Sequence, residues 1–416
     1  MASIVQNSEM RMIGPAQRRT LIAAALGWML DSFDVMLYAI VLANVMRDLH
    51  MTKGQAGMLN TLTLLASGIG GVLFGFVADR IGRTRALMLS ILTYSLCSFA
   101  SGLSTTILML AVFRFILGLG MGGEWNTGAT LVAETWPTQL RAKAIAVVQS
   151  SWAIGYAAAA LVAWAVLRLW DWRAVFFVGV LPALLTFWIL REVPESEMWK
   201  AHQREQRTAC SAQPGFGEIL RGKYARPTFA LTAMNLFGMF AWWGLFTWLP
   251  GYLKLPVAEG GRGFNNNTTT WMLVVLNLVG MFPGYASFGW VADRLGRRRS
   301  VMLYTLAAAL VVPIYAMARD PRTLMLLGIP VAFFGTGFFS GSGIIGSEVF
   351  PTRVRARALG LTYNGARMLS ALAPFTIGRV AERHGLSWAF LLCSSSFFLS
   401  MIAACLLPET RGKQLE

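Results

Sequence analysis

The sequence predicts an all-α membrane protein with twelve transmembrane helices in two pseudo-symmetric six-helix bundles. Three observations predict this class. Of the 416 residues, 56% are hydrophobic and only 13% are charged, about half the charged fraction of a typical soluble domain. The apolar residues fall in runs of about 20, the length that crosses a hydrocarbon core of roughly 30 Å. The third observation is a repeat that relates the two halves of the chain.

The apolar runs define the expected spans. They lie near residues 20–45, 55–78, 86–104, 106–132, 144–166 and 174–191, and then near 228–253, 269–292, 300–318, 323–347, 356–380 and 386–407. The polar stretch between the two sets holds no apolar run of membrane length. We therefore divide the chain into an N-terminal bundle, a central loop and a C-terminal bundle, at residues 1–192, 193–227 and 228–416.

Three motifs recur at one offset. GFVADRIGR at 75–83 recurs as GWVADRLGR at 289–297, ETWP at 134–137 as EVFP at 348–351, and PES at 194–196 as PET at 408–410; each pair is 214 residues apart. One offset for three motifs indicates a duplicated bundle of six helices. Parallel repeats with a binding site near the midplane between them are typical of alternating-access carriers.

The net charge of +16 reflects topology, not nucleic-acid binding. With the N-terminus in the cytoplasm, 24 of the 36 lysines and arginines fall on the inner side and 10 on the outer side. This bias obeys the positive-inside rule. An even number of spans then places both termini in the cytoplasm, and we expect a multi-pass protein of the bacterial inner (cytoplasmic) membrane. With no ATP-binding loop, nucleophile triad or metal cluster, we expect neither an enzyme nor a cofactor.

The doubled loop G-x-x-x-D-R-x-G-R, together with R-x-x-x-G-x-G at 114–120, resembles the major facilitator superfamily over essentially the whole chain. DSFD at 31–34 is similar to the aromatic-acid and sialate proton symporters. GGEW at 122–125, ETWP at 134–137 and WRAVFF at 172–177 are closer to the sialate/monocarboxylate group. The resemblance implies a monomer in the bilayer that moves a small organic anion with protons. The central region has no room for the two extra helices of the best-known bacterial sialic acid carrier, so the particular acid stays open.

The repeated loop predicts a gate at the cytoplasmic side. Asp79 lies at a helix end, where a carboxylate can interact with a facing helix dipole. Arg83 can reach Glu134, and the second half repeats this arrangement with the set Asp293, Arg297 and Glu348. We expect these charges to pair when the inner gate is shut and to separate when it opens. The alternative is that the arginines only set topology.

Five ionisable residues fall within the spans: Asp31, Asp34, Arg114, Glu124 and Arg367. A charge near the bilayer centre costs at least about 2.5–3.5 kcal/mol, so such groups are usually functional or neutralise one another. Asp31 and Asp34 share a helix face with Tyr38, and two carboxylates this close should not both stay ionised.

By resemblance to proton-coupled sugar carriers, Asp34 exchanges a proton and Arg114 tunes the pKa of Asp34. The alternative is that the two residues form a permanent structural ion pair. Glu124 is about 15 Å from Arg114 along the helix and on another face. It could carry a proton, contact substrate or be a structural acid.

Arg367 is the expected anion-binding residue, because a guanidinium fork fits carboxylates with two hydrogen bonds. Tyr363 and Asn364 add polar groups within one turn, and the repeat places Gln149 at the matching height. A competing interpretation pairs Arg367 with a helix C-terminus. Further candidates for the substrate cavity are Tyr38, Asn235 and Trp243.

Span five lacks the Gly-Pro element of the drug/proton antiporters of this superfamily, which favours proton symport. Two alternatives remain. A carrier that exports drugs or neutral solutes fits Arg367 poorly, and a transporter-like receptor usually has a long soluble tail or an enlarged central loop.

Overall fold

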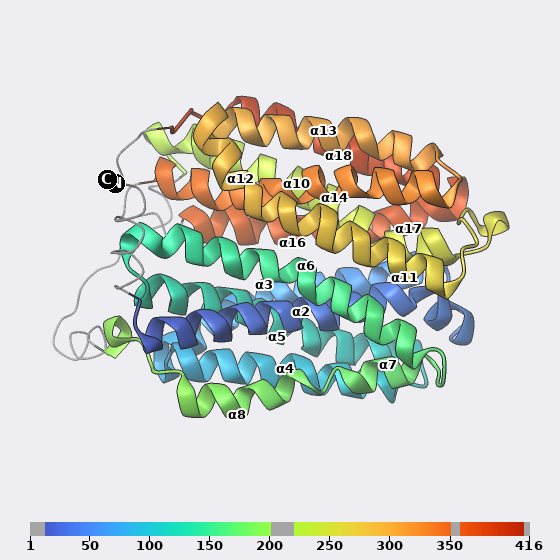
Figure 1. The fold of residues 1–416 in the computed structure, drawn as a ribbon, viewed down its shortest axis with the longest axis horizontal. Coiled ribbons are helices and arrows are strands. Elements are labelled where there is room, and N and C mark those ends of the chain that lie inside the picture. The colour runs from blue at the N-terminus through green and yellow to red at the C-terminus, as the bar shows by residue number, and fades with distance from the viewer. Residues whose placement is uncertain (1–12, 201–219, 351–357, 412–416) are drawn as a thin grey trace.

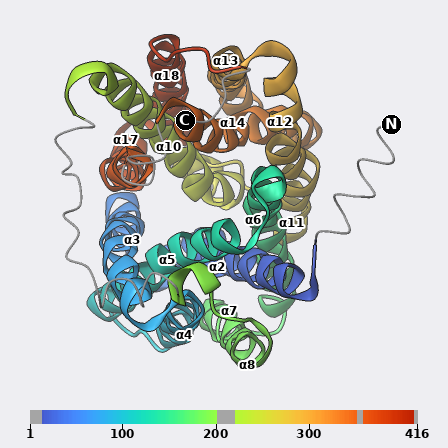
Figure 2. The same ribbon diagram turned by 90° about the vertical axis from the view of Figure 1, so that its left-hand side faces the viewer.

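The structure is a computed structural model that describes residues 13–200, 220–350 and 358–411, and the regular elements in these ranges are all helices. The long helices run side by side along the longest axis of the molecule (Figure 1). Viewed along that axis, helices α2 to α8 lie on one side and α10 to α18 on the other (Figure 2). These two sets are called the N half and the C half.

The N half supplies the first six expected spans. Its helices are α2 (Pro15–Asp48), α3 (Lys53–Ile81), α4 (Arg83–Gly102), α5 (Ile107–Thr135), α6 (Thr138–Val166), α7 (Trp172–Val178) and α8 (Pro182–Glu192). The sixth span is split into α7 and α8 around Gly179, and Pro182 stands in the first turn of α8. A proline there is tolerated because the first N–H groups of a helix have no intrahelical partner.

The C half supplies the other six. Its elements are η2 (Gly222–Tyr224), α10 (Ala225–Lys254), η3 (Val257–Glu259), α11 (Asn266–Val275), η4 (Leu276–Met281), α12 (Phe282–Leu295), α13 (Arg297–Met317), α14 (Pro321–Val349), η5 (Gly360–Gly365), α16 (Ala366–Ser370), α17 (Ala373–His384) and α18 (Leu386–Cys405). Elements η4 and η5 are π-helical turns. The eighth and eleventh spans are therefore irregular near their middles.

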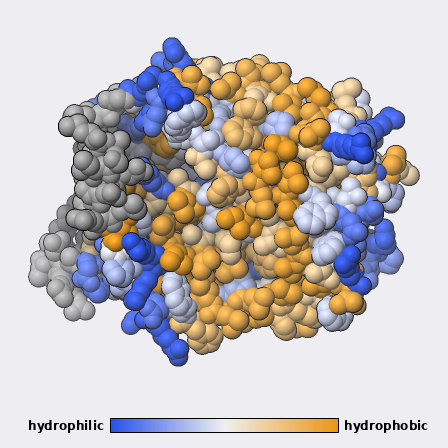
Figure 3. Space-filling view, in the orientation of Figure 1, coloured by the Kyte–Doolittle hydropathy of each residue, from blue (hydrophilic) through white to orange (hydrophobic). Residues whose placement is uncertain are grey.

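The predicted fold class is confirmed. Ten helical segments of the described chain are long and apolar enough to cross a membrane. The two remaining spans are α4, which begins with Arg83 and Arg85 and is rich in serine and threonine, and the interrupted eleventh span, η5 to α17. Apolar side chains cover the middle of the face in Figure 3, and hydrophilic residues gather toward both ends. This distribution is that of a multi-pass membrane protein.

The two ends of the bundle differ. The motif end carries the repeated loops 75–83 and 289–297, and the distal end carries the connections around residues 49–52, 167–171 and 255–265. Hydrogen bonds between described residues of opposite halves lie in the distal part of the bundle. They include bonds that join Lys53 to the Glu259 carbonyl (2.6 Å), Gly54 N to Glu382 (2.6 Å), Asn60 to Thr247 (2.9 Å), Tyr156 to the Phe246 carbonyl (3.2 Å) and Lys254 to Asn44 (2.6 Å).

Close backbone approach completes the distal contact. A Cβ atom added to Gly57 of α3 would lie 2.3 Å from the carbonyl oxygen of Pro374 in α17. One added to Gly378 would lie 2.5 Å from the carbonyl oxygen of Lys53. Small residues allow helices within membranes to approach this closely. The halves are therefore sealed together at the distal end.

Helix α2 lies at the centre of this arrangement. Its residues from Asp31 to Ala43 are all buried, on every face of the helix. An apolar helix that is buried all round belongs to the interior of a bundle. The two aspartates of α2 are thereby held away from the lipid and must find their partners among other helices.

Candidate functional site

The five ionisable residues predicted within the membrane are all buried: Asp31, Asp34, Arg114, Glu124 and Arg367 are between 0% and 5% exposed. They divide into two groups by the half of the protein from which they come. The within-half group is Asp34 of α2 and Arg114 of α5, with the side chains beside them. The cross-half group is Asp31 of α2, Glu124 of α5 and Arg367 of α16.

In the within-half group, the Arg114 guanidinium lies over the Tyr38 ring, 4.6 Å from its centroid. The Tyr38 hydroxyl donates to the Ala56 carbonyl at 2.9 Å, and one Asp34 oxygen accepts from Ser98 at 3.1 Å. Asp34 and Arg114 interact electrostatically, but none of the Arg114 side-chain nitrogens has a hydrogen-bond partner. The predicted Asp34–Arg114 interaction therefore acts through space, without direct contact.

In the cross-half group, Arg367 interacts electrostatically with both Asp31 and Glu124. One oxygen of Asp31 and both oxygens of Glu124 have no hydrogen-bond partner. This group joins two acids of the N half to one cation of the C half.

Gly27 provides the space for the Glu124 carboxylate. A Cβ atom at Gly27 would lie 2.5 Å from Glu124 Oε1. Gly27 stands four residues before Asp31, one turn of helix away on the same face. The absence of a side chain at this position of α2 thus lets the acid of α5 approach the acid of α2.

Irregular helix geometry surrounds Arg367. The π-helical turn η5 precedes it, and the backbone turns at Ala371 before α17 begins, with Pro374 in its first turn. π-Helical turns within α-helices are frequent at functional sites. The apolar pattern of the sequence predicted a continuous span around Arg367 and did not indicate these interruptions.

Polar side chains extend from Arg367 toward the N half. Arg367 interacts electrostatically with Tyr363, and Tyr363 lies near Tyr285 of α12. Tyr285 in turn lies beside Gln149 of α6. The structure therefore connects Gln149, Tyr363 and Arg367, which the repeat had placed at matching heights. Tyr285 had not been predicted.

The other predicted cavity residues take different positions. Asn364 is half-buried on η5, next to Tyr363. Asn235 donates to the Thr362 carbonyl at 3.2 Å, and its side-chain oxygen has no partner. Tyr38 belongs to the within-half group described above. Trp243 is 5% exposed and packs against other tryptophans.

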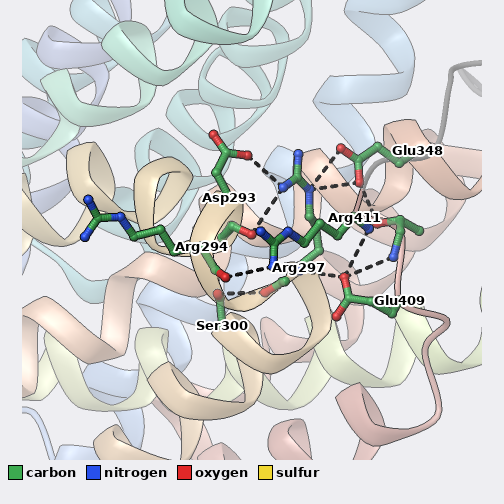
Figure 4. A network of polar contacts seen from close by, with 10 residues as sticks. Asp293, Arg294, Arg297, Ser300, Glu348, Glu409 and Arg411 are labelled. Carbon is green, nitrogen blue, oxygen red and sulfur yellow. Dashed lines mark hydrogen bonds and ion pairs between the residues drawn. The ribbon is translucent and has the colours of Figure 1, made fainter.

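The gate residues form one network at the motif end of each half. In the N half, Arg83 contacts Asp79 at 2.6 Å and Glu134 at 3.3 Å. In the C half, Arg297 contacts Asp293 at 2.7 Å and Glu348 at 3.2 Å (Figure 4). The partners predicted from the sequence are therefore in contact.

Each network lies inside a single half, so a movement of one half against the other does not require these pairs to separate. They are intact in a structure whose distal end is sealed. That they separate when the gate opens stays a prediction.

A third acid completes each network, and the sequence analysis assigned it no role. Glu195 accepts from the backbone N–H of Arg83 at 2.8 Å, and Glu409 accepts from that of Arg297 at 2.8 Å. Gly82 and Gly296, which precede these arginines, have φ of 106° and 96°, a conformation that favours glycine. The repeat of PES and PET at the common offset was the signal for this contact.

Among the residues whose placement the structure describes, no group of three or more histidine, cysteine or acidic side chains could hold a metal ion.

Comparison with known proteins gives a consistent picture. The Major Facilitator Superfamily profile matches residues 24–266 and 255–416. A "Probable 4-methylmuconolactone transporter" of Cupriavidus pinatubonensis is 33% identical over 410 residues, covering 97% of this chain and 93% of the relative. A sialic acid transporter of Escherichia coli is 30% identical over 401 residues, covering 94% of each chain. The crystal structure of a D-xylose–proton symporter superposes with a TM-score of 0.78 at 18% identity, covering 96% of this chain and 100% of that one.

Proposed function

The chain belongs to the major facilitator superfamily and is a membrane transporter, not an enzyme, and we propose that it carries a small organic anion together with protons. The observation that carries this proposal is the cross-half group, in which one buried cation of the C half faces two buried acids of the N half. A site for an anion and a site for protons then share one electrostatic environment.

Arg367 is the anion-binding residue of this proposal. Its guanidinium presents a planar fork that fits a carboxylate with two hydrogen bonds, and it lies on an irregular turn between the halves. The two relatives support an organic acid, because a muconolactone and a sialic acid both carry a carboxyl group.

Asp31 and Glu124 are the proton carriers. A substrate carboxylate bound to Arg367 offsets the positive charge that otherwise stabilises these two acids. A buried acid whose positive neighbour is neutralised binds a proton more readily, so anion binding and proton binding favour each other. The sequence favoured Asp34, which interacts electrostatically with Asp31 and with Arg114 inside the N half; its role as a carrier is the alternative.

The sealed distal end supports a mechanism of alternating access. With both termini in the cytoplasm, the distal end faces outward, and rocking of one half against the other would open it while closing the motif end. The networks of Arg83 and Arg297 hold the helix ends of each half together during this movement. They would act on the rate of transport by keeping each half rigid.

The test is substrate-induced proton flux in proteoliposomes. We would screen N-acetylneuraminate, lactate, benzoate, a dicarboxylate, a sugar and a cationic dye. Vesicles with Arg367→Gln correct for acids that cross the bilayer unaided. Proton entry with at least one acid, absent in the variant, is expected. Transport of only the sugar or the dye would favour a neutral-solute or drug carrier and contradict the proposal. Binding of an acid without any translocation would instead indicate a receptor.

A further inference from the structure

Five tryptophans from both halves pack together near the cross-half group. They are Trp28 of α2, Trp125 of α5, Trp152 of α6, and Trp242 and Trp243 of α10, and are called the tryptophan cluster. The Trp152 ring lies 4.7 Å from that of Trp28 and 6.0 Å from that of Trp242, measured between centroids. Trp152 therefore connects the aromatic rings of the N half to those of the C half.

Three indole N–H groups of this cluster have no hydrogen-bond partner. They belong to Trp28, Trp152 and Trp242, which are at most 3% exposed. An indole nitrogen can only donate, and a buried one usually finds an acceptor. Three unpaired donors beside one another indicate a place where acceptor atoms from outside the protein can bind.

The tryptophan cluster is continuous with the charged site. Trp28 precedes Asp31 by three residues on α2, which puts both on one face, and Trp125 follows Glu124 directly. On the other side, the Trp242 ring lies 5.7 Å from that of Phe339, and the Phe339 ring lies 6.3 Å from that of Tyr285, which lies beside Gln149. Aromatic rings thus adjoin the carboxylate side and the polar side of the site.

We propose that the transported anion is a planar, unsaturated acid whose flat ring or conjugated chain stacks on the tryptophan cluster while its carboxylate binds Arg367. This inference rests on the proposed function and names its substrate class. Oxygen atoms elsewhere on the substrate accept hydrogen bonds from the unpaired indoles.

Flat π-systems gain offset-stacked and edge-to-face contacts with aromatic rings that saturated rings cannot make. A polyhydroxylated, non-planar acid would bring many hydroxyl groups against indole faces that offer few polar partners, and would lose hydration there. Because the rings come from both halves, movement of the halves would open the cluster to admit the substrate and close it again.

The test uses two acids of similar size that differ in planarity. Titration calorimetry on the purified full-length protein would give Kd for benzoate and for cyclohexanecarboxylate, with N-acetylneuraminate as the polyhydroxylated acid. We expect benzoate to bind about tenfold more tightly than cyclohexanecarboxylate, as expected for one or two aromatic contacts. N-acetylneuraminate should bind more weakly than benzoate.

Variants then test which side chains cause the preference for the planar acid. Trp152→Leu should bring the two Kd values close together, and Trp152→Phe, which keeps a ring and loses the N–H, should retain the preference. Trp388→Leu is the matched control, because Trp388 of α18 is 66% exposed and should change neither value. Arg367→Gln should weaken the binding of both acids by the same factor.

Equal binding of the two acids by the wild-type protein, or a preference that survives Trp152→Leu, would overturn the planar-acid inference while leaving the proposed function intact. If none of the three acids binds, or if binding does not depend on Arg367, the proposed function itself is contradicted.

Discussion

The within-half and cross-half groups contain the same kinds of side chains but respond differently to movement. Asp34, Arg114 and Tyr38 all belong to the N half, so their separations are preserved when that half moves as a body. Asp31 and Glu124 face Arg367 of the C half, so their electrostatic interaction changes whenever the halves move. Under the proposed function, the cross-half group is therefore the one whose proton binding responds directly to this movement.

The largest effect is expected when the cation of the cross-half group is removed. Arg367→Gln should reduce kcat/KM for anion uptake by about 10- to 100-fold, the range expected when charged hydrogen bonds of about 1.5–3 kcal/mol are lost. Arg367→Lys keeps the charge but loses the planar fork, so its kcat/KM should lie between those of wild type and Arg367→Gln. Uptake rates in proteoliposomes check this. Equal uptake by wild type and Arg367→Gln would remove Arg367 from the site.

A smaller effect is expected from displacing Glu124 without changing its charge. In Gly27→Ala the new Cβ would lie 2.5 Å from Glu124 Oε1. Overpacking of this kind costs about 1–3 kcal/mol, so proton-driven uptake should fall at least several-fold. Gly343→Ala on α14 is the control, because its added Cβ would meet nothing within 4 Å. Equal effects of the two substitutions would contradict the role of Gly27.

The motif-end networks should also leave proton coupling unchanged, because each of them lies within a single half. Asp79→Asn removes an exposed ion pair with Arg83, and such pairs are worth about 1 kcal/mol or less. Turnover should therefore slow by no more than about fivefold, and Asp293→Asn should behave alike. The ratio of protons to anions should not change. A changed ratio in either variant would connect these networks to coupling.

The smallest effect is expected when the Tyr38 hydroxyl is removed. Tyr38→Phe removes the hydrogen bond to the Ala56 carbonyl at 2.9 Å and keeps a ring beneath Arg114. The loss should be about 1 kcal/mol of stability, seen as a lower thermal midpoint of the purified protein. Proton coupling should be unaffected, and its loss would give the within-half group a part in transport.

These predictions depend on contacts that the sequence could identify only in part. Composition and the 214-residue repeat predicted the twelve-helix fold, because a membrane imposes span length and a duplication repeats its motifs. The five buried charges were found because ionisable residues are rare within spans.

The interaction of Asp34 with Arg114 was predicted from the sequence, but the cross-half group was not. It depends on how α5 is rotated, on the space left by Gly27, and on the turns η5 and 371–372 that aim Arg367 at the N half. The tryptophan cluster also needed the structure, because its members come from four helices of both halves. The local signs in the sequence were the spacing of Trp28 before Asp31 and the position of Trp125 directly after Glu124.

The most direct test of the account is the proton-to-anion ratio in proteoliposomes containing Glu124→Gln or Asp34→Asn, measured beside wild type with the same acid. If protons bind in the cross-half group, Glu124→Gln loses proton-driven accumulation while retaining anion exchange, and Asp34→Asn keeps the wild-type ratio. Loss of coupling in Asp34→Asn with a normal ratio in Glu124→Gln would contradict it and assign proton exchange to the within-half group.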